Sequence, residues 1–149
     1  MAVLEKNRIK LQATATDKLD AIRQAGNLLV ESGCVEAAYV EGMLARESTM
    51  STYLGNGVSI PHGQYDNRDH VIKTGISVLQ VPAGIVWDDD DEDELAFLII
   101  GIAAKGDEHM TVLSNLADAI EDEEMAEEMA RTEDVDLILK ALNGVPDSA

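Results

Sequence analysis

The sequence predicts an α/β protein in which helices cover both faces of a central β-sheet. Short β-branched stretches alternate along the 149-residue chain with amphipathic segments of helical period, and interleaved strands and helices form this class of fold. Residues 95–104, LAFLIIGIAA, are apolar at nearly every position, as expected of a central strand buried on both faces. A chain of this length is predicted to form a single domain, residues 1–149, around one core.

Two amphipathic helices are predicted in the first third of the chain. Thr16-Asp17 can cap the first helix, which Gly33 ends. The second helix begins near Glu36 and carries Arg46 in its last turn. The apolar stripes of the two helices are Leu19, Ile22, Ala25, Leu29 and Val30, then Tyr39, Val40, Met43 and Leu44. Arg46 is therefore predicted at a helix C-terminus.

The predicted strands precede the apolar segment. Val58-Ser59-Ile60 alternates as a short strand, and Pro61 ends it because proline cannot donate to a sheet ladder. Residues 72–78 alternate again and predict a second strand. Seven consecutive acidic residues follow Trp87, at positions 88–94. They lack the glycine and ligand spacing of a calcium loop, so a solvated loop is predicted there rather than a cation site.

Three helices are predicted after the apolar strand. An apolar stripe from Met110 to Ile120 marks the first, and an acidic helix containing Met125 and Met129 follows. Asp134 can cap the last helix, residues 135–142. His109 is expected at the start of the first of these helices, just beyond the end of a strand.

Composition narrows the classes of function. With 29 acidic residues against 11 Lys and Arg, the formal charge is −18, which would repel nucleic acid and favours a basic protein partner. The single Cys34 cannot form a disulfide within the chain, which favours a reducing compartment, and it is predicted to be a small buried apolar residue. The N-terminus lacks a signal-peptide pattern, and the longest apolar run is too short to span a bilayer. A soluble, cytoplasmic protein is expected.

Two of the three histidines are candidates for chemistry. His62 lies between Pro61 and Gly63 at a strand end, and His109 also follows a strand, so both could lie at one edge of the sheet, where α/β folds bind ligands. A neutral imidazole can act as a nucleophile at cellular pH. Phosphoryl transfer would use such a nucleophile together with donors such as Arg46.

The residues alone leave simpler interpretations open. A loop histidine is more often a surface residue, and His70, in a polar run, is interpreted in that way. Arg46 could merely favour the helix dipole. A metal site formed by His62 and His109 lacks the usual ligand spacings, and no nucleotide-binding or serine-hydrolase motif is present.

Three segments together resemble a known family: MLARESTMSTYLGNGVSIPHG, VIKTGISVLQ and LIIGIAAKGDEHMTVLSNLADAI. They are similar to the enzyme IIA domain of the mannitol/fructose family of the bacterial sugar phosphotransferase system. The resemblance implies a mixed sheet flanked by helices on both faces, with no cofactor and no metal. It implies that His62 accepts a phosphoryl group from phospho-HPr and passes it to a cysteine of a IIB domain. His109 and Arg46 match the family's second active-site histidine and its arginine.

The run Thr52-Tyr53-Leu54-Gly55 resembles mannitol-type members. The resemblance therefore predicts a phosphocarrier for mannitol uptake that associates with membrane-bound IIBC through a mannitol-type IIB domain. Tyr53 and Leu54 are expected on the rim around His62. The alternatives are a fructose-type IIA and a nitrogen-related regulatory IIA that acts by binding other proteins. Since Cys34 does not lie in a strand-to-helix phosphate loop and no membrane segment is present, a stand-alone IIA protein is expected.

Overall fold

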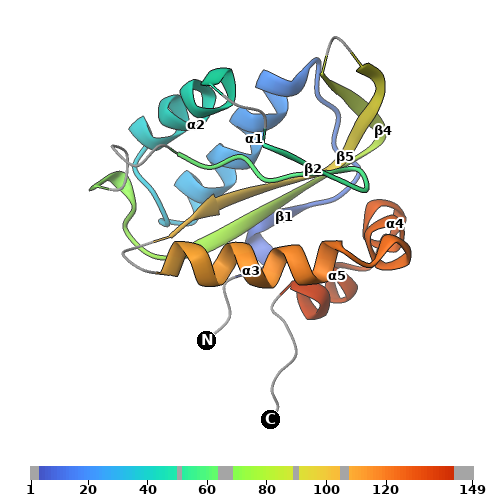
Figure 1. Ribbon diagram of the computed structural model, residues 1–149. Coiled ribbons are helices and arrows are strands. Elements are labelled where there is room, and N and C mark those ends of the chain that lie inside the picture. Colours follow the sequence, from blue (N-terminus) through green and yellow to red (C-terminus); the bar gives the residue numbers. More distant parts are fainter. Residues whose placement is uncertain (1–3, 50–51, 64–68, 89–90, 105–107, 143–149) are drawn as a thin grey trace.

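The computed structural model describes residues 4–49, 52–63, 69–88, 91–104 and 108–142. Five strands form one sheet in the order β1-β4-β5-β3-β2 (Figure 1). The strands are β1 (Ile9–Lys10), β2 (Tyr53–Gly55), β3 (Val58–Ser59), β4 (Gly75–Asp88) and β5 (Asp91–Ala103). β4 and β5 pair antiparallel along most of their length, whereas β1 runs parallel to β4 and β3 parallel to β5. The sheet is therefore mixed, as the resemblance predicted.

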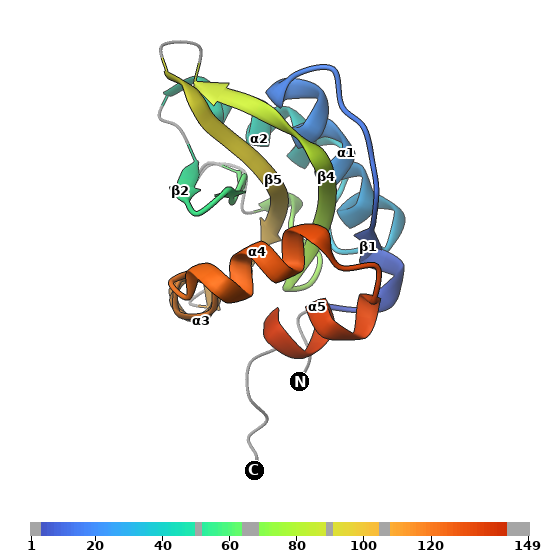
Figure 2. The ribbon, with the colours of Figure 1, turned by 90° about the vertical axis from the view of Figure 1, so that its right-hand side faces the viewer.

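Helices cover the sheet on both faces (Figure 1). The helices are α1 (Lys18–Glu31), α2 (Ala38–Thr49), α3 (Glu108–Ile120), α4 (Glu123–Arg131) and α5 (Val135–Leu142). α1 and α2 pack on one face, and α3, α4 and α5 gather on the other, beneath the long curved β4–β5 hairpin (Figure 2). Along β5, Ile99 belongs to the first of these cores, and its neighbours Leu98 and Ile100 belong to the second. This arrangement confirms the α/β class and the strand buried on both faces.

Local signals placed the helix ends correctly. The Asp17 side chain accepts a hydrogen bond from Asp20 N at 2.9 Å and caps α1. Gly33, at φ +83°, follows the end of that helix, in the left-handed conformation that favours glycine. Asp134 Oδ1 accepts from Asp136 N at 3.0 Å at the start of α5. Each of these contacts spans only a few residues, so the sequence pattern was sufficient.

Several short or extended elements differ from prediction. The strands β1 and β2 and the 3₁₀ helix η1 (Lys6–Arg8) were not predicted. Each has only two or three residues and, unlike Val58-Ser59-Ile60, none is followed by a proline that marks its end. The solvated loop predicted for residues 88–94 is wrong in part, since β4 continues to Asp88 and β5 begins at Asp91, which pairs with it; residues 89 and 90 lie outside the described residues. An antiparallel ladder satisfies the hydrogen bonds of the backbone whatever side chains the residues carry. The hairpin therefore extends beyond its apolar part.

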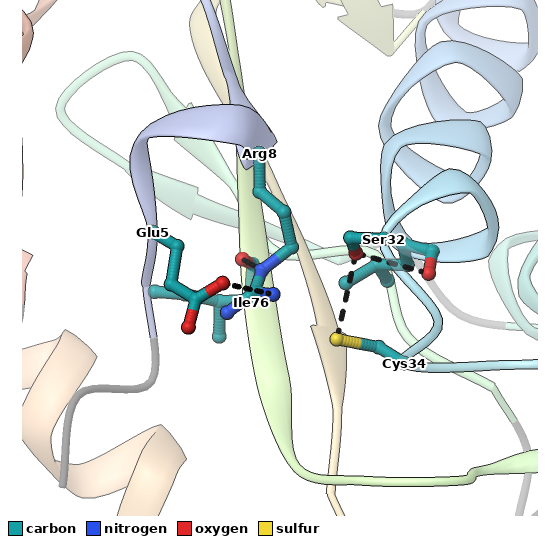
Figure 3. Close-up of polar contacts among 6 residues, drawn as sticks. Glu5, Arg8, Ser32, Cys34 and Ile76 are labelled. Atoms are coloured by element: carbon teal, nitrogen blue, oxygen red, sulfur yellow. Dashed lines mark hydrogen bonds and ion pairs between the residues drawn. The ribbon is translucent and has the colours of Figure 1, made fainter.

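The N-terminal segment is fixed to the sheet by Arg8 (Figure 3). The Arg8 side chain is buried, and its Nε donates to Ile76 O at 2.9 Å, while Nη1 lies 3.4 Å from Glu5 Oε1. Nearby, Cys34 is fully buried and unoxidised. A Cβ added at Gly75 would lie 2.7 Å from Cys34 Sγ, so the thiol packs directly against the β4 backbone. Cys34 is confirmed as a small buried apolar residue.

Candidate functional site

His62 lies at the end of the parallel strand pair β3 and β5. It forms an isolated parallel bridge with Ile102, the penultimate residue of β5. Ile102 N donates to Pro61 O at 3.0 Å. The carboxyl ends of parallel strands are where α/β folds bind ligands. The structure thus places His62 at the sheet edge that the sequence predicted.

The imidazole of His62 is held in one orientation by its own strand. Its Nδ1 lies 2.8 Å from Ile60 O. Because a carbonyl oxygen only accepts hydrogen bonds, Nδ1 carries the proton in the neutral ring, and Nε2 carries the lone pair. The side chain is half-buried. In the neutral ring this contact therefore selects the tautomer in which Nε2 could act as a nucleophile.

Tyr39, in the first turn of α2, joins the two backbone segments beside His62. Its hydroxyl donates to Ile102 O at 2.8 Å and accepts from Gly63 N at 2.9 Å. The residue is only 5% exposed. Burial raises the pKa of the Tyr39 phenol above its usual value of 10.0, and the hydrogen bond from Gly63 opposes that shift. The phenol is therefore neutral at cellular pH and can donate and accept at once.

Glu47, in the last turn of α2, fixes the segment that pairs with the strand before His62. It is buried, and its Oε1 accepts from Thr52 N at 3.1 Å and from Thr52 Oγ1 at 2.6 Å. Its Oε2 accepts from Trp87 Nε1 at 3.1 Å and lies 3.5 Å from Lys18 Nζ. Thr52 O in turn accepts from Ile60 N at 2.9 Å. A chain of contacts therefore runs from Glu47 in α2 through Thr52 to Ile60, whose carbonyl oxygen orients the His62 imidazole.

Sequence interpretation missed both Tyr39 and Glu47 as parts of the site. Tyr39 stood in the apolar stripe of its helix and was interpreted as a core residue. Glu47 follows Arg46 in the last turn of its helix, and no role was assigned to it. Each residue has a polar group in a buried position, and buried polar groups require hydrogen-bond partners. A polar side chain at a position expected to be buried could therefore have suggested a role.

The other predicted site residues lie at the expected positions in the elements. Arg46 is half-buried in the last turn of α2. His109 is the second residue of α3, the helix that follows β5; its side chain lies outside the described residues. The two histidines therefore follow neighbouring parallel strands. Contact of Arg46 or His109 with a phosphoryl group on His62 stays a prediction.

His70 and Tyr53 do not join this site. His70 Nδ1 lies 2.9 Å from Glu36 Oε1 in a pair whose side chains are 36% and 59% exposed, which agrees with a surface residue. The expectation that Tyr53 lies on the rim of His62 is wrong. Its hydroxyl lies 3.4 Å from Leu95 O, near the other end of β5, because the ring extends along the sheet away from the bridge at Ile102. The side chain of Leu54 lies outside the described residues.

In the described part of the chain, no group of three His, Cys, Asp or Glu side chains could hold a metal ion. Among the helices of that part, none is long and apolar enough to cross a membrane.

The fold and the site define an α/β protein with an oriented histidine at the edge of its sheet. The sequence model of the "Phosphoenolpyruvate-dependent sugar phosphotransferase system, EIIA 2" family matches residues 2–145, and the chain belongs to that family. It is therefore a phosphotransferase component.

Similar segments occur in larger proteins whose names are those of components of this system. The mannitol-specific EIICBA component of Pasteurella multocida is 44% identical over 140 residues, which are 94% of this chain and 22% of that protein. The multiphosphoryl transfer protein of Haemophilus influenzae is 47% identical over 135 residues, 91% of this chain and 26% of that protein. The chain thus spans about a quarter or less of the length of these relatives.

Solved structures share the fold over almost the whole chain. Enzyme IIA mannitol from Escherichia coli superposes with a TM-score of 0.86 at 42% identity, covering 93% of this chain and 97% of that one. In the complex of enzyme IIAMTL with phosphorylated enzyme IIBMTL from the same organism, the TM-score is 0.87 at 41% identity, covering 95% and 99%. The nitrogen regulatory protein IIA-Ntr from Neisseria meningitidis has a TM-score of 0.79 at 26% identity, covering 94% and 96%.

Proposed function

We propose that this protein is a phosphocarrier that accepts a phosphoryl group on Nε2 of His62 from phospho-HPr and passes it to the cysteine of a mannitol-type IIB domain. The observation that carries the proposal is the 2.8 Å contact between His62 Nδ1 and Ile60 O. It supports the tautomer of the neutral ring in which Nε2 carries the lone pair that attacks phosphorus. Family membership supports the same reaction class.

The proposed transfer needs no group beyond the donor, the acceptor and the side chains of this chain. Nε2 forms a bond to phosphorus while the bond from phosphorus to the donor breaks, and the proton stays on Nδ1. The ring becomes cationic as the new bond forms, so the hydrogen bond to Ile60 O strengthens. Arg46 and His109 are proposed to donate to the phosphoryl oxygens, because catalysis of phosphoryl transfer depends mainly on positioning and charge stabilisation.

The choice of a mannitol-type IIB partner follows from the relatives. One of the similar solved structures is a complex of IIAMTL with phosphorylated IIBMTL, and the Pasteurella relative is named mannitol-specific. The regulatory IIA-Ntr is more distant, at 26% identity. We propose a cytoplasmic location beside membrane-bound IIBC, and a single domain over residues 1–149.

A phosphorylation assay tests the acceptor. Incubation with phospho-HPr is expected to add one acid-labile phosphate to the wild-type protein and none to His62→Ala. His70→Ala is the matched control, since His70 lies in an exposed pair with Glu36, and it should be labelled normally. Arg46→Ala and His109→Ala should be labelled about 100-fold more slowly. Label that persists in His62→Ala, or that maps to His109, would refute the assignment.

A second assay tests the partner. The family resemblance also left a fructose-type IIA open, so a fructose-type IIB is the alternative acceptor. Phosphorylated protein should transfer rapidly to a mannitol-type IIB and slowly to a fructose-type IIB. Preference for the fructose-type domain would overturn the mannitol assignment alone, and transfer to neither would favour a regulatory role.

A further inference from the structure

We propose that Tyr39 is a positioning residue for phosphoryl transfer: its hydroxyl ties the backbone that follows His62 to the end of β5 and so holds Nε2 in the direction of the incoming phosphoryl group. This inference rests on the proposed function of His62. Tyr39 does not touch the reacting atoms in this scheme, and it acts through Gly63 and Ile102.

The hydroxyl of Tyr39 has the contacts that such a role requires. It donates its single proton to Ile102 O at 2.8 Å and accepts from Gly63 N at 2.9 Å. Ile102 is the bridge partner of His62, and Gly63 is its next residue in the chain. The hydroxyl therefore ties the backbone that follows His62 to the end of β5.

The Tyr39 ring holds that hydroxyl in a fixed place. The residue is 5% exposed and packs in the core beneath α2, with Met43 and Val35 in the same apolar cluster. A tyrosine ring has only two rotatable side-chain bonds, and burial on a helix restricts both. Gly63, by contrast, has wide backbone freedom when nothing restrains it. The rigid Tyr39 ring therefore restrains the flexible backbone at Gly63.

The imidazole then has two independent restraints. The Nδ1 contact with Ile60 O fixes the rotation of the ring relative to the residues before His62. The Tyr39 contacts fix the backbone after it. Loss of the second restraint lets the main chain of His62 move while the first contact persists. A misplacement of about 1 Å can slow a reaction by about 100-fold without weakening binding.

Tyr53 provides a matched control within the same sheet. Its hydroxyl also accepts from a glycine, Gly57 N at 3.3 Å, and lies near a β5 carbonyl, Leu95 O at 3.4 Å. Leu95 lies seven residues before Ile102, about 23 Å along an extended strand. Tyr39→Phe and Tyr53→Phe therefore remove the same chemical group from the two ends of one strand pair.

The experiment compares these two variants in steady-state phosphorylation by phospho-HPr and in nitrogen-15 NMR of the unphosphorylated full chain. Tyr39→Phe should lower kcat about 10- to 100-fold with KM unchanged, whereas Tyr53→Phe should keep both constants of the wild type. In NMR, Tyr39→Phe should speed hydrogen exchange at Gly63 N and shift the ring-nitrogen resonances of His62. Replacement of Tyr39 by 4-aminophenylalanine restores an N–H donor and should recover part of kcat. This second variant provides the kinetic comparison if Tyr39→Phe does not fold.

The two proposals fail in different ways. A wild-type protein that takes no phosphate on His62 would overturn the proposed function, while the NMR comparison would still report whether Tyr39 orders the segment at Gly63. A wild-type protein that is phosphorylated normally, with kcat of Tyr39→Phe equal to that of Tyr53→Phe, would overturn the positioning role. A change confined to KM, or no recovery with 4-aminophenylalanine, would overturn it as well.

Discussion

At each end of the β3–β5 strand pair, a tyrosine hydroxyl contacts a glycine N–H and a carbonyl oxygen of β5, but the two tyrosines are buried to different extents. At the carboxyl end, Tyr39 is buried and its hydroxyl has partners at 2.8 and 2.9 Å. At the amino end, the Tyr53 hydroxyl has partners at 3.4 and 3.3 Å beside an open cavity of about 380 Å³. Water can replace a lost partner in an open site, but not in a closed one. We therefore expect the buried hydroxyl to restrain the backbone more strongly than the open one, and the candidate nucleophile lies at the buried end.

The largest effect on stability is expected at Glu47, which connects α2 to both Thr52 and Trp87. Glu47→Ala leaves the Trp87 Nε1 and Thr52 donors buried without this acceptor, so the free energy of unfolding should fall by about 3–5 kcal/mol. Urea denaturation measures the change. Glu36→Ala, in an exposed pair with His70, is the control and should change stability by less than about 0.5 kcal/mol. Equal effects of the two variants would contradict the structural role of Glu47.

The next largest effect on stability is expected from removing the two tyrosine hydroxyls, one at each end of the strand pair. Tyr39→Phe removes the hydroxyl from a buried carbonyl and from a partly buried N–H, and it should lower the free energy of unfolding by about 1–3 kcal/mol. Tyr53→Phe should cost less than about 1 kcal/mol, because its bonds are long and the site is open to water. Urea titration of both variants at neutral pH gives the two values. A larger loss of stability for Tyr53→Phe than for Tyr39→Phe would contradict the expectation that the buried hydroxyl contributes more.

A smaller effect on stability is expected at Gly57, at the amino end of the strand pair. Gly57 has φ +80°, and an added Cβ would lie 2.9 Å from Phe97 Cδ2. Gly33 has φ +83°, with nothing within 4 Å of an added Cβ. Both substitutions to alanine incur about 1 kcal/mol of backbone strain, and Gly57→Ala also has to displace the Phe97 ring. Thermal unfolding should show a lower melting temperature for Gly57→Ala, while its phosphorylation rate stays near that of the wild type. A melting temperature at or above that of Gly33→Ala would show that Phe97 moves freely.

The smallest expected effect is a dependence of stability on alkaline pH. Burial raises the pKa of the Tyr39 phenol in the folded protein, so the phenol stabilises the fold fully below the unfolded pKa of about 10. That contribution is lost as pH rises through the raised folded pKa. The stability advantage of the wild type over Tyr39→Phe should therefore shrink above pH 10. Urea denaturation from pH 8 to 11 measures it, and a constant advantage over that range would contradict the assignment.

Much of the fold was predicted from sequence because its signals are local. The Asp17 cap and the left-handed Gly33 act within one helical turn, and apolar periodicity identified the helices. The extension of β4 to Asp88 was not predicted, because its acidic residues match no apolar pattern and only pairing with the neighbouring strand makes them extended. The position of the Tyr53 hydroxyl was predicted wrongly, because nothing in a four-residue run shows where a long side chain points.

The sequence by itself determined the helices, the buried central strand, and His62 at a strand end between Pro61 and Gly63, because each of these depends on neighbouring residues. Only the tertiary structure decided which groups surround that histidine. The Tyr39 hydroxyl reaches Gly63 across 24 positions of the chain and Ile102 across 63. Such contacts form only when a helix and two strands pack together, and the same tyrosine in a helical stripe would otherwise be an ordinary core residue.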